Sequence, residues 1–420
     1  MPRSPRAAPR PGTAQSALRH RDFRIVWAGT FTSNIGTWMQ NVLLGAYGYT
    51  LTHSAAYVGL LYFAQLGPLL LLSVVGGVAA DTFDRKRLLV AMQIEQLVGS
   101  LVLAALALSD RPNLVGIALC VLAIGIGNAF SAPAMGAILP TLVPREDIPG
   151  SVSLQSVQMN LSRVIGPVLG APLYAASGAA VVFAINAATY LFAIISLLIA
   201  KYGRTASHPP TERGLARLAS GFRIARHDPL ILRILTTLFI FSFCSLTFVG
   251  LMPVVSAVNF GIRPKSTQYG VLYAVFGFGA AMGAIAVGTV LHHIRKERLV
   301  RVGLVAFAVL LVAFALVRRP ALAYPAVAVL GFAYFVVITA LSTVLQSHLD
   351  NAIRGRVMAL WIMGFGGTVP LGVFVGGWLV RVIGVTYVLV YGAVVALGLA
   401  WYADLRAAAA RSRAVATVRA

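Results

Sequence analysis

Apolar runs long enough to cross a lipid bilayer follow one another along almost the whole chain. From Phe23 onward, each run holds roughly 20 residues, the length at which an α-helix spans the hydrocarbon core of a membrane. The polar breaks between the runs predict twelve spans, at approximately 24–49, 55–80, 87–108, 113–139, 149–177, 179–200, 229–258, 268–292, 298–317, 321–347, 356–380 and 384–403. The expected fold class is therefore an all-α membrane protein.

The charge of the chain fits this interpretation. Only 11% of the 420 residues are charged, too few to cover a soluble protein, and 34 Lys and Arg against 12 Asp and Glu give a net charge of +22. Such an excess could indicate nucleic-acid binding, but the basic residues alternate with the spans: 27 fall on the side of the two termini, six on the other and Arg163 inside a span. The positive-inside rule thus predicts a multi-pass protein of the plasma (bacterial inner) membrane with cytoplasmic N- and C-termini, and no nucleic-acid partner.

Polar segments divide the chain into five parts. We expect a disordered basic cytoplasmic tail (1–22), a six-helix bundle (23–200), a cytoplasmic linker (201–228), a second six-helix bundle (229–405) and a cytoplasmic tail (406–420). Three short features recur roughly 200 residues later in the same order: Leu139–Val143 at Leu341–Leu345, the loop Gly77–Lys86 at Gly288–Lys296, and Pro167 at Pro370. A parallel six-plus-six repeat is typical of secondary transporters, whose substrate site lies between the halves.

A basic loop follows the second span. It contains Gly77, Asp81, Arg85 and Lys86, and glycine at position 77 allows close helix packing. Asp81 is expected at a helix end, where it can accept hydrogen bonds from an arginine or a helix N-terminus of the other half. The alternative is an ordinary solvated basic loop.

The loop resembles the signature between the second and third helices of the major facilitator superfamily, Gly-x-x-x-Asp-x-x-Gly-Arg-(Arg/Lys)-(Arg/Lys), except that Asp84 stands at the second glycine. Segments 18–24, 140–148, 160–170 and 354–360 resemble the transmembrane secretion effector branch of siderophore and drug exporters. The resemblance covers about residues 18–400. It implies two pseudo-symmetric six-helix bundles that move a small molecule by alternating access. It also implies a gate, in which Asp81 binds Arg356 and closes the cytoplasmic side when the cavity opens outward.

The fifth span carries a second resemblance. Aligned on Gly166 and Pro167, it is similar to a glycine-rich pattern of drug and proton antiporters, with Gly170 at a further matching position. Small residues and a proline would let this helix bend and approach the opposite bundle, a gating role that favours export. Ordinary small-residue packing between membrane helices is the alternative.

Two ionisable residues lie well inside predicted spans, where a charge is costly and needs a reason. Arg163 could bind an anionic substrate group, or pair with Glu95 or backbone carbonyls. Glu95 is the sole carboxylate that could carry a coupling proton, or it is a partner of neighbouring polar residues. Uncharged side chains that could line a cavity, or else join helices by hydrogen bonds, include Asn34, Gln40, Asn128, Gln158 and Asn160.

No sequence pattern points to an enzyme. The chain has no Gly-Lys dipeptide of a phosphate-binding loop, no metal-ligand spacing and no Gly-x-Ser-x-Gly elbow, so we expect no cofactor, no metal and no catalytic residue. The leading hypothesis is a monomeric secondary transporter that exports a small organic molecule, a drug or a siderophore-like compound, using an ion gradient, with a proton as the candidate coupling ion. An importer of the same fold is the alternative, and a non-transporting membrane scaffold or enzyme is a remote one.

Overall fold

Helices alone make up the regular structure of the described part of the chain. The computed structural model describes residues 10–202, 215–410 and 412. Their long elements are α2 (Arg21–Thr52), α3 (Ala55–Thr82), α4 (Arg85–Ala107), α5 (Leu114–Ile138), α6 (Ile148–Ser177), α7 (Ala179–Ile199), α12 (Thr267–Gly288), α13 (Lys296–Leu316), α14 (Pro320–His348) and α17 (Val385–Tyr402). Two further spans are interrupted by π-helical turns: α9 (Pro229–Ile240), η3 (Phe241–Ser245), α10 (Thr247–Gly250) and α11 (Met252–Phe260), then α15 (Asn351–Ile362), η4 (Met363–Gly367) and α16 (Thr368–Ile383).

These helices agree with the predicted spans. Within the described residues, nine helical segments are long and apolar enough to cross a membrane. The three long helices outside that set, α2, α3 and α6, contain 32, 28 and 30 residues. Together they are consistent with the twelve expected spans and with a major facilitator architecture.

Capping side chains determine where several helices begin. Ser54, Asn113 and Ser266 each accept a hydrogen bond from a backbone N–H in the first turn of the helix that follows. Asp84 does the same for α4, accepting from the N–H of Arg87 at 2.8 Å. Asp84, which stands where the family signature has its second glycine, therefore has a structural role: it caps the N-terminus of α4.

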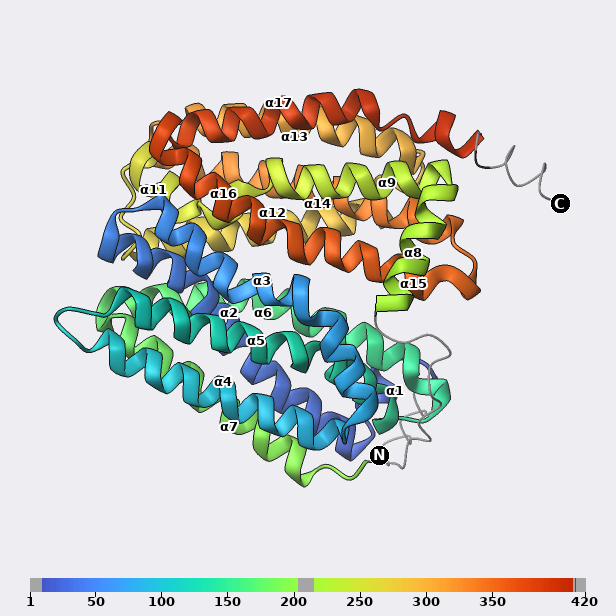
Figure 1. Cartoon of the computed structure of the whole chain (residues 1–420), viewed down its shortest axis with the longest axis horizontal. Helices are drawn as coiled ribbons and strands as arrows, with labels where there is room; N and C mark the ends of the chain where they lie inside the picture. Colours follow the sequence, from blue (N-terminus) through green and yellow to red (C-terminus); the bar gives the residue numbers. More distant parts are fainter. Residues whose placement is uncertain (1–9, 203–214, 411, 413–420) are drawn as a thin grey trace, which may run out of the picture.

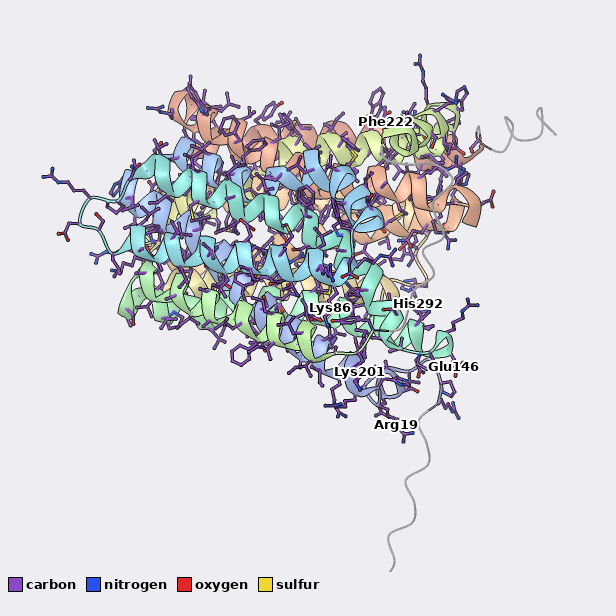
Figure 2. All side chains as sticks on the ribbon, turned by 60° about the horizontal axis from the view of Figure 1, so that its bottom comes forward. Arg19, Lys86, Glu146, Lys201, Phe222 and His292 are labelled. Atoms are coloured by element: carbon purple, nitrogen blue, oxygen red, sulfur yellow. The ribbon has the colours of Figure 1, made fainter. Side chains whose placement is uncertain are left out.

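Figure 1 shows two layers, with α2–α7 in the lower half of the view and α9–α17 in the upper half. Two pairs of helices join them, because α3 packs along α16 and α6 packs along α12. A short helix, α8 (Leu215–His227), lies at one end beside α15. We call this the linker end, and the opposite end the far end. Arg19, Lys86, Lys201 and His292 are all labelled at the linker end in Figure 2.

Two parts of the chain differ from the sequence expectation. The predicted disordered tail, whose residues 1–9 lie outside the described part, contains the short helix α1 (Ala14–Ala17). The N–H of Gly12 donates to Asp147 Oδ1 at 2.8 Å, and this contact ties the tail to the start of α6. The predicted linker contains α8, which is too short and too basic to be recognised as a membrane span.

Candidate functional site

The two bundles touch along helices that carry glycine at the contact. A Cβ atom at Gly59 of α3 would lie 2.8 Å from the carbonyl oxygen of Val373 on α16, so only glycine permits this approach. On the other side, Gly270 of α12 lies against Ala171 of α6, also near the Pro167 carbonyl. Both contacts lie toward the far end, where α3 and α12 begin and α16 and α6 end.

Toward the linker end, the same face of α6 is uncovered. Val164 and Ala171 contact α12, and positions further down this face follow at helical spacing. These positions, Ser153, Val157 and Asn160, are exposed. On α3, a Cβ atom at Gly77 would have no neighbour within 4 Å. The bundles are therefore in contact at the far end and separated at the linker end.

Arg163 lies on α6 at this interface. Its guanidinium carbon lies 4.7 Å from the centre of the Trp38 ring on α2, within the range of a cation–π interaction. Its Nε atom is buried and has no hydrogen-bond partner within the described residues. The pairing with Glu95 considered from sequence is not seen in the described structure, which shows no ion pair between the two side chains.

Tyrosines from both bundles lie within electrostatic range of the same guanidinium. Tyr62 on α3, Tyr273 on α12 and Tyr334 on α14 are each close enough to Arg163 for an electrostatic interaction. The rings of Phe276 and Tyr334 stack nearly in parallel with centroids 6.1 Å apart. The site thus combines a half-buried cation with the Trp38 ring and nearby tyrosines, an arrangement suited to an anionic, aromatic ligand.

Sequence reasoning identified Arg163 but missed the aromatic residues around it. Trp38, Tyr62, Tyr273 and Tyr334 lie in apolar runs in which an aromatic side chain is the expected packing residue. Their spacing along the chain carries no signal, since they come from four different helices. A charged residue inside a span was the only sequence feature that could locate this site.

Glu95 lies elsewhere, between α4 and α5. Its carboxylate points at Gly127, where a Cβ atom would collide with Oε2. Oε2 is buried and has no hydrogen-bond partner in the part of the chain that the structure describes. A half-buried carboxylate in this setting can take up a proton, but it has no direct contact with the Arg163 site.

The uncharged polar candidates divide into two groups. Gln40 joins three helices, because its Oε1 accepts hydrogen bonds from Ser100 at 3.1 Å and Asn186 at 2.8 Å. Gln158 donates to Thr30 at 3.1 Å, connecting α6 to α2. These two side chains hold helices of one bundle together.

The three asparagine candidates form no hydrogen bond to another helix within the described residues. Asn160 is exposed and donates only to the Ser156 carbonyl of its own helix, at 2.9 Å. Asn34 and Asn128 are half-buried, and their side chains form no hydrogen bond among the described residues. Asn160, one turn from Arg163 on the uncovered face of α6, is the candidate best placed to meet a ligand.

In the fifth-span motif, the glycines and the proline face different partners. A Cβ atom at Gly166 would lie 2.7 Å from the Met39 nitrogen, and Gly170 also contacts Met39, so both glycines pack α6 on α2 within one bundle. The close approach to the opposite bundle, which the sequence analysis assigned to the small residues in general, is made by Pro167 and Ala171.

The basic loop is anchored to its own bundle. Lys86 donates to the carbonyls of Leu198 at 3.0 Å and Ala200 at 3.4 Å, and so satisfies the C-terminal end of α7. Gly76, rather than Gly77, makes the close packing contact, because a Cβ there would lie 2.7 Å from the Ala129 carbonyl oxygen.

The predicted latch stays a prediction. The Asp81 side chain lies outside the described part of the structure. Arg85 is the first residue of α4. Arg356 lies in α15, where its carbonyl oxygen would be 2.9 Å from a Cβ atom at Gly221 of α8.

Each bundle has an Asp–His pair at the linker end. In one, Asp147 before α6 lies 2.8 Å from Nε2 of His20 at the start of α2; this hydrogen bond and the Gly12 N–H lower the pKa of Asp147. In the other, Asp228 at the start of α9 lies 2.8 Å from Nε2 of His348 at the end of α14. The arrangement is reversed between the bundles: α2, the first span of one bundle, begins next to His20, whereas α9, the first span of the other, begins next to Asp228.

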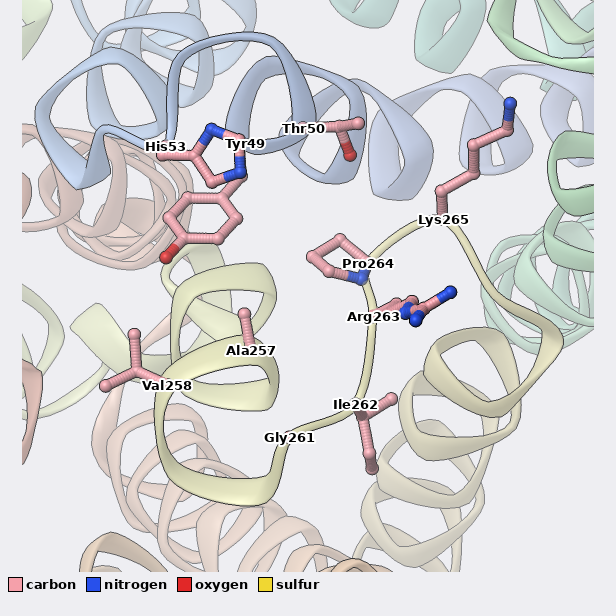
Figure 3. Close-up of a pocket in the computed structure, with 10 residues that line it drawn as sticks. All are labelled: Tyr49, Thr50, His53, Ala257, Val258, Gly261, Ile262, Arg263, Pro264 and Lys265. Atoms are coloured by element: carbon pink, nitrogen blue, oxygen red, sulfur yellow. The ribbon is translucent and has the colours of Figure 1, made fainter.

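A pocket of about 490 Å³ opens at the far end, on the seam between the bundles. Figure 3 shows it between Tyr49, Thr50 and His53 at the end of α2 and a loop that carries Arg263 and Lys265. Two of the six basic residues counted on this side of the membrane thus line one pocket.

Comparisons with known proteins agree with the fold. A model of the transmembrane secretion effector family matches residues 12–417. The enterobactin exporters EntS of Escherichia coli strain UTI89 and Citrobacter koseri are 28% and 29% identical over 352 and 345 residues, 81% of each chain. The solved structure of the POT family transporter PepTSo superposes with a TM-score of 0.75 at 13% identity, over 94% of this chain and 98% of that chain.

A helical membrane fold and a family match along nearly the whole chain describe a transporter rather than an enzyme. The chain belongs to the transmembrane secretion effector family of the major facilitator superfamily.

Proposed function

We propose that this chain is a secondary active exporter of a small organic anion with aromatic rings, a siderophore-like compound or a drug. The observation that carries the proposal is the environment of Arg163. Its buried Nε has no hydrogen-bond partner among the described residues, its guanidinium lies over the Trp38 ring, and Tyr62 of one bundle and Tyr334 of the other are within electrostatic range. A ligand bound there would contact both halves of the protein, as alternating access requires.

The helix contacts support the transport step. The bundles meet through Gly59 and Gly270 toward the far end, while the face of α6 at Val157 and Asn160 is uncovered toward the linker end. Rocking the bundles about this contact would exchange which end is open. The basic residues gathered at the linker end support placing that end in the cytoplasm, so this arrangement would receive cargo from inside.

We further propose that a proton gradient drives export, with Glu95 as the proton carrier. It is the only carboxylate well inside the predicted spans, and its Oε2 has no partner among the described residues. Because Glu95 and Arg163 are not in contact, coupling between them would pass through α7 and α2, which pack between α4 and α6, rather than through direct competition.

Transport into inverted membrane vesicles tests the proposal. Enterobactin, the cargo named for the relatives, and a panel of aromatic drugs serve as probes, with and without an uncoupler. We expect energised accumulation that Arg163→Gln lowers at least tenfold, because a hydrogen bond to a charged group contributes about 1.5–3 kcal/mol.

Arg111→Gln, which changes an exposed arginine in a far-end loop, is the matched control and should transport like the unaltered protein. Glu95→Gln should transport equally with and without the uncoupler. Accumulation only in right-side-out vesicles would identify an importer. Equal transport by Arg163→Gln and Arg111→Gln would refute the Arg163 site.

A further inference from the structure

The linker helix α8 is basic and seated on the second bundle. Residues 215–227 contain three arginines and a histidine and no acidic residue. Gly221 lets the backbone of α8 approach α15, because a Cβ atom at Gly221 would lie 2.9 Å from the carbonyl oxygen of Arg356. Ala225, one turn further along α8, is buried. Phe222, Arg223 and Arg226 on the remaining surface are exposed.

A groove of about 1040 Å³ lies between this helix and α9. Its upper rim is basic, formed by Arg223, Arg226 and His227. Its floor is largely apolar and continues along α9 through Leu232, Leu235, Thr236, Phe239 and Ile240. Of these, Leu232 and Ile240 are exposed and Leu235 is buried. Figure 1 shows α8 crossing the linker end beside α9, and Figure 2 labels Phe222 on the outside of this helix.

Within the described residues, the two arginines of the rim have no partner. Neither guanidinium of Arg223 and Arg226 forms a hydrogen bond or ion pair among the described residues, and no acidic side chain lines the groove. The nearest carboxylate in the sequence, Asp228, is occupied by His348 and by the hydroxyl of Ser412 at 2.9 Å. The rim therefore presents uncompensated positive charge.

The depth of the groove matches one leaflet of a bilayer. From Pro229 at the start of α9 to Ile240 at the bottom of the groove, eleven residues at 1.5 Å each give about 17 Å. Half of a hydrocarbon core is about 15 Å. A basic rim at the surface with an apolar floor of this depth has the chemistry of a phospholipid with a negative headgroup.

We infer that an anionic phospholipid occupies this groove, with its phosphate against Arg223 and Arg226 and an acyl chain along Thr236 and Ile240. Since α8 also rests on α15, which leads through η4 into α16 at the interface between the bundles, the lipid would stabilise the position of a helix that moves during transport. Lipid binding in this groove does not depend on which cargo the protein transports.

Native mass spectrometry of the purified, delipidated full-length protein tests it directly. Dioleoylphosphatidylglycerol and dioleoylphosphatidylcholine are titrated separately. We expect the unaltered protein to prefer phosphatidylglycerol, and Arg223→Gln/Arg226→Gln to lose roughly tenfold to thirtyfold of that preference. Arg19→Gln/Arg24→Gln, which removes two exposed charges from the linker end of the other bundle, is the matched control and should retain it.

A second variant tests the floor. Thr236→Trp would fill the groove without changing its charge, and we expect it to lower the occupancy of both lipids at least fivefold. Unchanged occupancy in Thr236→Trp, or an equal loss of preference in the two double variants, would overturn the inference. Competition by glycerol 3-phosphate would also overturn it, because a soluble anion would then suffice. Circular dichroism of each variant confirms that the helices are intact.

Discussion

Asp228→Asn separates the two roles of the aspartate at the start of α9. Its Oδ1 accepts hydrogen bonds from the N–H groups of Leu230 at 2.8 Å and Ile231 at 3.1 Å, and so caps the helix. Its Oδ2 lies 2.8 Å from His348. Asparagine has an oxygen that can keep the cap, but it loses the negative charge that attracts the histidine.

The size of the effect follows from the pKa of Asp228. Burial raises it, but hydrogen bonds from His348, the Ile231 N–H and Ser412 outweigh burial and lower the pKa from 3.8 to about 2. At about 1.4 kcal/mol per pH unit, the ionised form stabilises the fold by about 2–3 kcal/mol. The side chain is only 23% exposed, so solvent screens little of this. Because asparagine keeps the cap, we expect Asp228→Asn to cost about 1–2 kcal/mol.

Thermal unfolding in detergent measures this loss. About 1–2 kcal/mol corresponds to a midpoint about 3–6 °C lower for a bundle of this size. The sign with pH is fixed: a carboxylate whose pKa is lowered by folding stabilises the protein above about pH 4, and the contribution is lost as the pH falls toward about 2. The difference between the unaltered protein and Asp228→Asn should therefore be largest near neutral pH and shrink over that window.

Asp350→Asn is the matched control, because this aspartate precedes α15, is exposed and makes no capping hydrogen bond. It should leave the midpoint unchanged. Equal losses in the two variants, or a difference for Asp228→Asn that persists at pH 2.5, would refute the reasoning.

Three further changes test the interface and the inner helices. Gly127→Ala places a methyl group on the Glu95 carboxylate, and we expect a thermal midpoint several degrees lower, since overpacking typically costs about 1–3 kcal/mol. Gly59→Leu prevents the far-end contact between α3 and α16, so maleimide labelling of Val157→Cys should fall several-fold as the linker end closes. Asp81→Asn should leave expression unchanged and lower transport by about tenfold, as measured in vesicles.

Each of these has a result that contradicts it. Gly136→Ala is the comparison, because a Cβ atom there meets nothing within 4 Å. If Gly127→Ala and Gly136→Ala have the same thermal midpoint, the packing of α4 on α5 accommodates the added methyl group without cost. If Val157→Cys is labelled equally with and without Gly59→Leu, the far-end contact does not control whether the linker end is open. Full transport by well-folded Asp81→Asn would remove the latch.

The sequence predicted the helices well because hydropathy is a local property. Each apolar run identifies a span without knowledge of its neighbours, and side chains such as Ser54 and Asp84 mark helix starts through contacts within one turn. The α8 helix escaped this reasoning. It is amphipathic and basic, and its stability comes from packing on α9 and α15 rather than from crossing a membrane.

The functional site was only partly predictable. Arg163 stood out because a charge inside a span is costly. Its contact with Trp38 crosses more than a hundred residues of chain, and the Asp147–His20 pair likewise joins positions 127 residues apart. No local pattern encodes such contacts. A pairing of Arg163 with Glu95, one of the alternatives left open by the sequence, is not formed, because α4 packs mainly on α5 and α7 whereas α6 packs mainly on α2 and α12.

By itself, then, the sequence predicted a series of apolar helices with which the structure is consistent, the asymmetry of basic charge between the two ends, and one cation inside a span that needed a purpose. Those properties depend on the free energy of moving each segment out of water, which is set residue by residue. The tertiary structure decided which glycines allow the bundles to touch, which face of α6 stays uncovered, and which aromatic ring lies against Arg163. Those properties depend on close packing between distant segments, and only the folded arrangement of both bundles fixes it.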